Sequence, residues 1–409
     1  MPNARILLPL RWRAFALLWM GQSISVFGDR MYATALPFLI LALGGGAAEL
    51  SITLTLFAAT QAALLPFAGV IVDRLPRRTT LVAADLVRAF TFLLLTALLA
   101  LDRLTIEVVY AVTALTGAVR AFFRPALRSL IPEILPSERL VAANALRSLS
   151  DEVLGAVGPV IAGTLVAIGA MAWVVGAHAA SFAVAGLLLL AVPLGHRHES
   201  RRPAVQGGIG RVWAELVEGL RATLSIPWLW RMIALSAVAN IFFAGALSVA
   251  LPLLAEASLG GPAGFGALLA AMAVGSVLAV LAIGRAERLW RRGILYYAGF
   301  VAAGTGMLLL AFVQDLVLAI LVAAFVGAAV AGFVLILETV IQELVPAPIL
   351  GRVASLESFG SLALLPVGYL LVGVLIGFIG PALTIALLGT ATVVAGFIGL
   401  GSRSIRSIM

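Results

Sequence analysis

An acid and a base stand side by side deep inside the first apolar run of the chain. If a membrane helix begins near Ala14, Asp29 lies roughly 22 Å along its axis, past the middle of a hydrocarbon core about 30 Å thick. An ionisable group at that depth is costly to hold there and is a functional candidate by default. We predict that Asp29 and its neighbour Arg30 act in substrate binding or in proton coupling, with Asp29 taking up and releasing the proton. The alternative is a structural Asp–Arg pair that ties this helix to a neighbouring one.

A second set of charges falls in two later apolar runs. Arg147 and Asp151 are four residues apart, so they can pair along one helix. Buried charges are usually paired. We therefore favour a compensated charge network, acting as a gate or in packing, over direct contact with a substrate. This network comprises Arg120, Arg124, Arg147, Asp151 and Glu152.

Polar residues in other apolar runs are further candidates. Glu338 and Glu357 lie at a depth similar to that of the network, and either could be a second titrating site. Asn240 lies near the middle of its run, where it could donate a hydrogen bond to a substrate or, as we favour, to a neighbouring helix. His178 is a lone histidine, and we expect a packing role for it rather than proton relay.

The pattern acid–Arg–Leu–X–Arg–Arg occurs twice, each time at the end of an apolar run. It reads DRLPRR at 73–78 and ERLWRR at 287–292. A second similarity links 130–163 to 344–373, where a Gly/Pro cluster is expected to break a helix midway in each copy. Two halves related by duplication are a transporter architecture, with the substrate site between them near the middle of the membrane.

These candidates need a scaffold that lies within a membrane. The 409 residues are 62% hydrophobic and 11% charged, whereas roughly a quarter of a soluble chain is charged. Many apolar runs exceed the length of about 18 residues that a membrane helix needs. The sequence predicts an all-α membrane protein of twelve transmembrane helices in two six-helix halves. The spans are expected at 14–42, 48–72, 79–101, 104–128, 139–168, 171–194, 227–256, 262–284, 293–313, 316–344, 350–376 and 379–401.

Charge distribution predicts the topology. The net charge is +8, and every basic residue is an arginine. Most arginines fall in the loops of one face, so the positive-inside rule places both termini in the cytoplasm. We attribute the positive charge to this rule and expect no nucleic-acid partner. The absence of cysteine excludes disulfides and thiolate metal sites. No phosphate-binding loop is recognisable, and we expect no cofactor, no metal and a monomer.

The longest polar stretch divides the chain into an N-terminal half at 1–194, a cytoplasmic linker at 195–226 and a C-terminal half at 227–409. Within the linker, helical spacing places Trp213, Leu216 and other apolar side chains on one face. This favours an amphipathic helix on the inner leaflet, or equally a linker helix packed on the bundle.

Two of these stretches resemble motifs of the major facilitator superfamily. GVIVDRLPRR, at 69–78, resembles the signature loop between helices 2 and 3, and GAVGPVIAG, at 155–163, resembles the Gly/Pro motif of helix 5 in its antiporter branches. Further stretches are similar to the branch that contains macrolide-efflux proteins and the enterobactin exporter: 21–40, 124–146, 215–231 and 349–358. The resemblance implies an exporter in the bacterial cytoplasmic membrane that moves an amphipathic organic molecule outward in exchange for protons, by alternating access.

The resemblance also implies roles for the motif residues. Asp73 would meet the start of helix 11 near Arg352. By the duplication, Glu287 would meet the start of helix 5, so that two latches close the cytoplasmic side. The basic residues of the loops would hold their own helices together. The implied gating residues are Gly69, Asp73, Arg74, Arg77, Arg78, Glu287, Arg288, Arg291, Arg292 and Arg352, and the antiporter-like motif is Gly155, Gly158, Pro159 and Gly163.

Other functions remain open. GDRMY, at 28–32, resembles helix 1 of ferroportin-type iron exporters, but Ala33 stands where a histidine ligand is expected, and predicted spans 7 and 11 contain neither Cys nor His. An iron or divalent-metal exporter is therefore kept as an alternative, as is a lysophospholipid flippase on the same fold. A channel or a non-transporting receptor is the alternative from another functional class. The paired basic loops favour a gated carrier over both.

Overall fold

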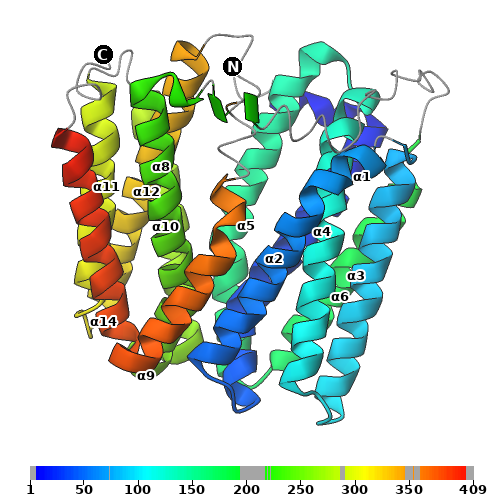
Figure 1. Ribbon diagram of the computed structural model, residues 1–409. Helices are drawn as coiled ribbons and strands as arrows, with labels where there is room; N and C mark the ends of the chain where they lie inside the picture. The colour runs from blue at the N-terminus through cyan, green and yellow to red at the C-terminus, as the bar shows by residue number, and fades with distance from the viewer. Residues whose placement is uncertain are drawn as a thin grey trace. The chain divides into compact units, whose positions relative to one another are not determined.

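The protein is all-helical, and its helices are long enough to cross a membrane (Figure 1). A computed structural model describes most of the chain. Eleven helices within the described residues have the length and apolar composition of membrane spans. The described residues are 6–72, 74–193, 217–218, 220–221, 223–285, 291–345, 353 and 360–401.

The first six spans agree with the expected ones to within a few residues, except that the fourth continues beyond 128. It runs on to Ile134 although Pro125 and Pro132 lie inside it. A short 3-10 helix, η2 (Leu8–Arg11), precedes the first span and another, η3 (Ser137–Arg139), precedes the fifth. The six helices are α1 (Arg13–Ala42), α2 (Ala47–Val72), α3 (Arg77–Ala100), α4 (Ile106–Ile134), α5 (Leu140–Ala167) and α6 (Met171–Leu190).

The second half contains one span with a π-helical insert and one long helix with a kink. The insert, η4 (Ala246–Ala250), joins α8 (Pro227–Gly245) to α9 (Leu251–Ser258) within a single span. Gly380 has φ 77° and ψ 170°, a conformation that favours glycine, and it divides the last helix where predicted spans 11 and 12 meet. The remaining helices are α10 (Gly261–Gly284), α11 (Arg292–Leu310), α12 (Leu316–Leu344) and α14 (Leu365–Gly401).

The chain forms two compact units. One contains Met1–Leu43 and Leu56–Gly210, and the other contains Gly44–Thr55 and Arg211–Met409. The boundary therefore falls inside α2, whose first turns belong to the second unit. There the Thr55 hydroxyl donates a hydrogen bond to the Pro366 carbonyl at 3.3 Å.

The packing inside each unit shows the duplication that the sequence predicts. A Cβ added to Gly117 of α4 would lie 2.3 Å from the Phe57 carbonyl oxygen of α2. In the second unit, a Cβ on Gly327 of α12 would lie 2.0 Å from the Met272 carbonyl oxygen of α10. In both units a glycine thus allows the fourth helix to touch the backbone of the second, as small residues do at membrane helix interfaces.

One of the two expected helix breaks needs correction. The helix α5 is continuous from Leu140 to Ala167, so the Gly158–Pro159 pair does not break it. Neighbouring helices can compensate for the donor that a proline removes from a membrane helix. In the second unit a turn at Leu364 interrupts the helix just before Pro366.

The expected amphipathic helix of the linker lies mostly outside the described residues, which include only positions 217, 218, 220 and 221 of it.

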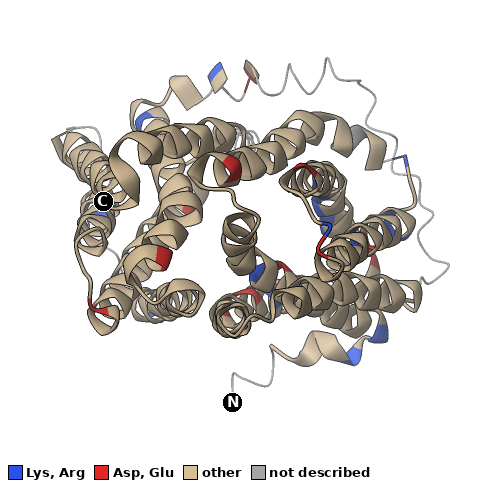
Figure 2. Cartoon of the chain, turned by 90° about the horizontal axis from the view of Figure 1, so that it is seen from below, with Lys and Arg blue, Asp and Glu red and all other residues tan. Residues whose placement is uncertain are grey.

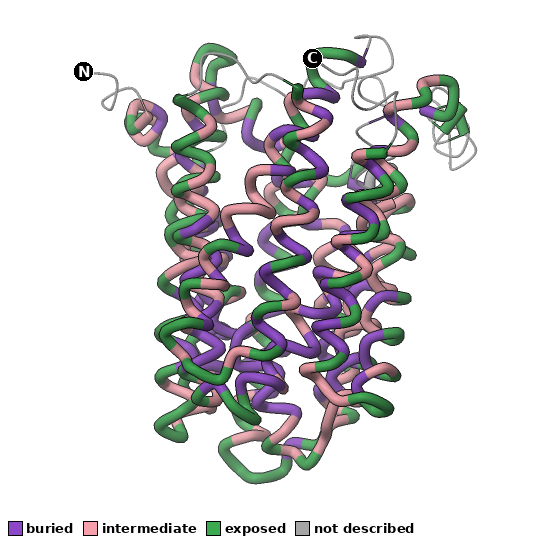
Figure 3. The backbone as a smooth tube through the Cα atoms, turned by 90° about the vertical axis from the view of Figure 1, so that its left-hand side faces the viewer, coloured by how far each residue is buried: buried purple, intermediate pink, exposed green. Residues whose placement is uncertain are grey.

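The surface of the helices carries many large apolar side chains. Figure 3 shows buried segments alternating with exposed ones along the helices. Large apolar side chains are among the exposed ones, including Phe90 at 71%, Trp173 at 78% and Phe378 at 83% exposure. Such a surface would be unfavourable in water and suits the hydrocarbon of a bilayer. The protein is therefore a multi-pass membrane protein.

Candidate functional site

Charged residues are sparse along the helices, where most of the chain is uncharged (Figure 2). Several of them gather around one polar cavity of about 140 Å³ inside the first unit. Side chains from α1, α3, α4 and α5 line it. They are Trp19, Gln22, Ser23, Ser25, Val26, Asp29, Arg88, Arg120, Phe123, Arg124, Leu127, Arg147, Ser150 and Asp151.

Asp29 has partners on two other helices. Arg120 of α4 donates a hydrogen bond from Nη1 to Asp29 Oδ2 at 3.2 Å. His178 of α6 places Nε2 3.8 Å from Asp29 Oδ1. The Asp29 side chain keeps 27% of its surface exposed, so a proton or a water molecule can reach it from the cavity.

His178 is part of an aromatic cluster as well as a neighbour of Asp29. Its ring stacks on Tyr32 with a centroid distance of 5.0 Å and lies 4.3 Å from the ring of Phe92 and 4.6 Å from that of Phe182. Its Nδ1 has no hydrogen-bond partner in the described part of the chain. The ring of His178 therefore has the packing role that the sequence favours. Its Nε2 adds an electrostatic contact with the Asp29 carboxylate.

Arg30 is not part of the cavity wall. Its side chain lies against α5, where a Cβ added to Gly158 would be 2.8 Å from Arg30 Cβ. Gly155 is one turn earlier, and its Cβ would lie 3.9 Å from the Arg30 guanidinium carbon. These two glycines of the antiporter-like motif thus provide the surface on which α1 packs at Arg30.

The site contains an ion pair that the sequence analysis did not identify. Asp85 and Arg88 of α3 are 0% and 4% exposed, and Arg88 Nη2 lies 2.5 Å from Asp85 Oδ1. The Arg88 guanidinium is 4.3 Å from the ring of Phe123 and 4.1 Å from that of Phe182. The sequence did contain a signal for this pair: two opposite charges stand three residues apart inside the third apolar run. Ionisable residues inside a membrane helix are functional candidates, as argued for Asp29.

The expected pairing within α5 is not formed. Arg147 and Asp151 both line the cavity, but no ion pair within 4.0 Å joins them in the structure. Arg124 also lines the cavity, and within the described residues it has no ion pair either. Glu152 is exposed and does not line the cavity. Four of the five network residues therefore gather at the cavity. Arg120 pairs there with Asp29 of α1, whereas Arg124, Arg147 and Asp151 form no ion pair among the described residues.

The polar candidates of the second half do not converge on one site. Asn240 donates a hydrogen bond from Nδ2 to the Ser361 carbonyl at 3.1 Å, the contact between helices that we favour. Glu338 is exposed on α12. Glu357 lies outside the described residues.

The basic loop residues connect neighbouring helices inside each unit. Arg77 at the start of α3 pairs with Glu133 near the end of α4, and Arg78 Nε donates to the Leu189 carbonyl of α6 at 2.9 Å. In the second unit Arg292 at the start of α11 pairs with Glu343 near the end of α12. Asp73, Glu287, Arg288 and Arg352 lie outside the described residues, so both latches remain predictions.

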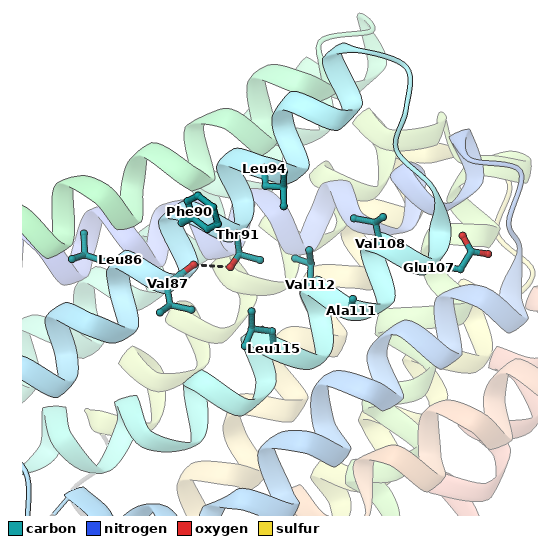
Figure 4. A pocket seen from close by; sticks show the side chains of 10 residues that line it. All are labelled: Leu86, Val87, Phe90, Thr91, Leu94, Glu107, Val108, Ala111, Val112 and Leu115. Atoms are coloured by element: carbon teal, nitrogen blue, oxygen red, sulfur yellow. Dashed lines mark hydrogen bonds between the residues drawn. The ribbon is translucent and has the colours of Figure 1, made fainter.

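A second, apolar pocket lies elsewhere in the first unit. It measures about 700 Å³ and lies between α3 and α4, with Phe90 and Leu94 on one wall and Val112 and Leu115 on the other (Figure 4). Glu107 is its single charged lining residue. We place the candidate site at the smaller cavity instead, because the intramembrane charges converge there.

Long apolar helices, two duplicated halves and a charged cavity within one half define a secondary transporter rather than an enzyme. The chain belongs to the Major Facilitator Superfamily, whose profile matches residues 18–256. It is 24% identical over 344 residues to the enterobactin exporter EntS of Escherichia coli O1:K1 / APEC, which covers 84% of this chain and 80% of that exporter.

Solved structures agree with this fold. The nucleoside transporter NupG (D323A mutant) superimposes with a TM-score of 0.71 at 14% identity, over 95% of this chain and 99% of NupG. A bacterial homologue of the iron transporter ferroportin, in its inward-facing state, gives the same TM-score of 0.71 at 15% identity, with coverage of 95% and 99%. At these identities the likeness shows the fold alone.

Proposed function

We propose that the protein exports an amphipathic organic small molecule, drug-like or siderophore-like, across the bacterial cytoplasmic membrane in exchange for protons. The two halves would expose the substrate site alternately to the two sides of the membrane. Both termini lie in the cytoplasm in this proposal, since most arginine-rich loops fall on that face. The substrate and protons are the partners, and the chain works as a monomer.

The contacts of Asp29 carry the proposal. As a carboxylate it accepts a hydrogen bond from Arg120 and lies 3.8 Å from His178, so α1 is connected electrostatically to α4 and α6. When Asp29 takes up a proton it becomes neutral, and the attraction to Arg120 is weakened. A ligand can shift a conformational equilibrium only through its different affinities for the two states. Proton binding at Asp29 provides such a difference between two arrangements of these helices.

Export of an organic molecule is supported by sequence similarity along most of the chain. The relatives named as enterobactin exporters match 84% of this chain or more at 23–24% identity. At such identities the substrate can differ, and we propose the direction and the chemical class of the cargo rather than its identity.

A substrate panel in efflux-deficient bacterial cells tests the proposal. Cells that produce the protein should accumulate less of at least one amphipathic compound than cells with the empty vector. A protonophore should restore accumulation to the empty-vector level. Efflux that persists unchanged when the protonophore has collapsed the proton gradient would contradict proton exchange.

A further inference from the structure

The cavity of the first unit contains more positive than negative charge. Four arginines and two aspartates line it. Two of the arginines have acidic partners, since Arg88 pairs with Asp85 and Arg120 pairs with Asp29. Arg124 and Arg147 remain, and neither has an ion pair among the described residues. Asp151 is the single remaining acid of the lining, and it is exposed, as is Arg124, whereas Arg147 is half-buried.

An arginine without an ion pair is costly where it is partly buried in a membrane helix, and Arg147 is half-buried. Both arginines belong to helices with the length and composition of membrane spans. Charged residues within membrane helices normally face a cavity and pair with one another or with a ligand. Arg124 and Arg147 come from α4 and α5, so one group bound between the two helices could accept hydrogen bonds from both guanidinium groups.

A second observation points to the same class of ligand. Gln22 of α1 is 8% exposed and lines this cavity, and its amide Nε2 has no hydrogen-bond partner among the described residues. An amide N–H is a donor, as are all the N–H groups of a guanidinium. The lining thus offers N–H donors from three helices, and a negatively charged group is the matching acceptor for each of them.

We propose that Arg124, Arg147 and Gln22 form an anion-binding subsite, and that the transported molecule is an organic anion whose acidic group enters it. This inference rests on the proposed function and specifies its substrate class. The cavity of about 140 Å³ accommodates an acidic group but not a drug-sized molecule, so the apolar part of the substrate lies outside it.

A negative charge on the substrate would change how strongly the membrane potential drives the exchange. An anion that leaves the cell and a proton that enters it both move positive charge inward. An inside-negative membrane potential therefore drives both halves of the exchange, in addition to the pH gradient. An uncharged substrate would leave only the proton to respond to the potential.

Binding of a matched pair of probes to the purified full-length protein in phosphatidylcholine nanodiscs tests the subsite. The probes are 11-(dansylamino)undecanoic acid and its uncharged methyl ester, and dansyl fluorescence reports binding after subtraction of empty nanodiscs. We expect the wild-type protein to bind the acid at least about ten-fold more tightly than the ester, as a charge-assisted hydrogen bond would give. Equal binding of the two probes by the wild-type protein would overturn the proposal without reference to any variant.

Variants locate the subsite. R124Q/R147Q should abolish the preference for the acid and leave the affinity for the ester unchanged. R103Q, which removes an exposed arginine in the loop after α3, is the matched control and should retain the preference. A preference that survives in R124Q/R147Q would overturn the assignment to these residues.

The same assay separates this proposal from the proposed proton exchange. No gradient is present, so binding does not depend on coupling. If proton-driven export fails while the preference persists, the subsite stands and the coupling does not. If the preference is absent while proton-driven export of another compound persists, the subsite is wrong and the coupling stands.

Discussion

Asp29 contacts a guanidinium on α4 and lies near an imidazole on α6, so a change in its charge acts on three helices at once. The Arg120 hydrogen bond at 3.2 Å is stronger when the carboxylate is ionised, because a neutral acid attracts a guanidinium less strongly. This is the property that a proton-coupled carrier needs from one residue.

Asp29→Asn should abolish efflux driven by a pH gradient while the protein still folds and binds its substrate. The amide has nearly the same shape but cannot exchange a proton, so the coupling is lost and the packing is kept. Flux in proteoliposomes under an imposed pH gradient measures this. Asp102→Asn is the matched control, since Asp102 is exposed in a loop with a left-handed φ of 52° that asparagine adopts readily. Wild-type flux through Asp29→Asn would contradict the assigned role.

The buried pair on α3 should show strong coupling in a double-mutant cycle. Arg88→Met leaves Asp85 buried without its partner, and we expect a loss of about 3–5 kcal/mol in the free energy of unfolding. Asp85→Leu should cost a similar amount, whereas the double variant should recover a large part, because no charge is then left unpaired. The free energy of unfolding of the four proteins is measured in mixed detergent micelles. Additive losses would show that the pair does not act as a unit.

At the level of helices, the antiporter-like motif of α5 is a packing surface for α1. Gly158→Ala should weaken this contact because the added Cβ would lie 2.8 Å from Arg30 Cβ, a distance that real Cβ atoms hardly ever show. We expect lower thermal stability and slower transport. Gly155→Ala is the control on the same helix, since its Cβ would make an ordinary contact of 3.9 Å with the Arg30 guanidinium. Equal effects of the two changes would mean that close packing at Gly158 is not what matters.

The span positions could be predicted from the sequence because the apolar runs are long and their ends carry charge, glycine or proline. The pattern acid–Arg–Leu–X–Arg–Arg also predicted a duplication, and the Arg77–Glu133 and Arg292–Glu343 pairs now appear as equivalent contacts in the two units. Pro159 was misread as a break, since the sequence does not show how neighbouring helices support an interrupted hydrogen-bond pattern.

Contacts between distant helices could not be predicted in the same way. Asp29 and Arg120 were both candidates, but nothing in their spacing indicates that they meet. For Arg147 and Asp151, the spacing allows a pair along α5 that the structure does not contain, because i, i+4 spacing permits a contact without requiring it. Which side chains share a cavity depends on helix rotation, and this is set by packing.

For the molecule as a whole, the sequence predicts that Asp73 latches the cytoplasmic side by meeting the start of helix 11. A helix N-terminus favours a carboxylate by roughly 0.3–1 kcal/mol, so Asp73→Asn should shift the population towards the inward-open state and slow turnover. Glu287→Gln should have a milder effect, because the second copy of the motif departs from the pattern at Ile283 and Gly284. The chain has no cysteine, so single cysteines introduced at the cytoplasmic ends of helices 5 and 11 can report accessibility without background. Unchanged labelling in Asp73→Asn would mean that the latch does not exist.

Reciprocity gives the most direct test of proton exchange. If a proton gradient drives the substrate, then a substrate gradient must drive protons in the opposite direction, because coupling between two ligands acts both ways. Proteoliposomes are loaded with a substrate identified by the panel and with a trapped pH-sensitive dye, and are then diluted into substrate-free buffer without a pH gradient. We predict that the lumen acidifies as the substrate leaves, and that the acidification is absent with Asp29→Asn. Substrate efflux from wild-type vesicles with no change in lumenal pH, or with alkalinisation, would contradict proton exchange.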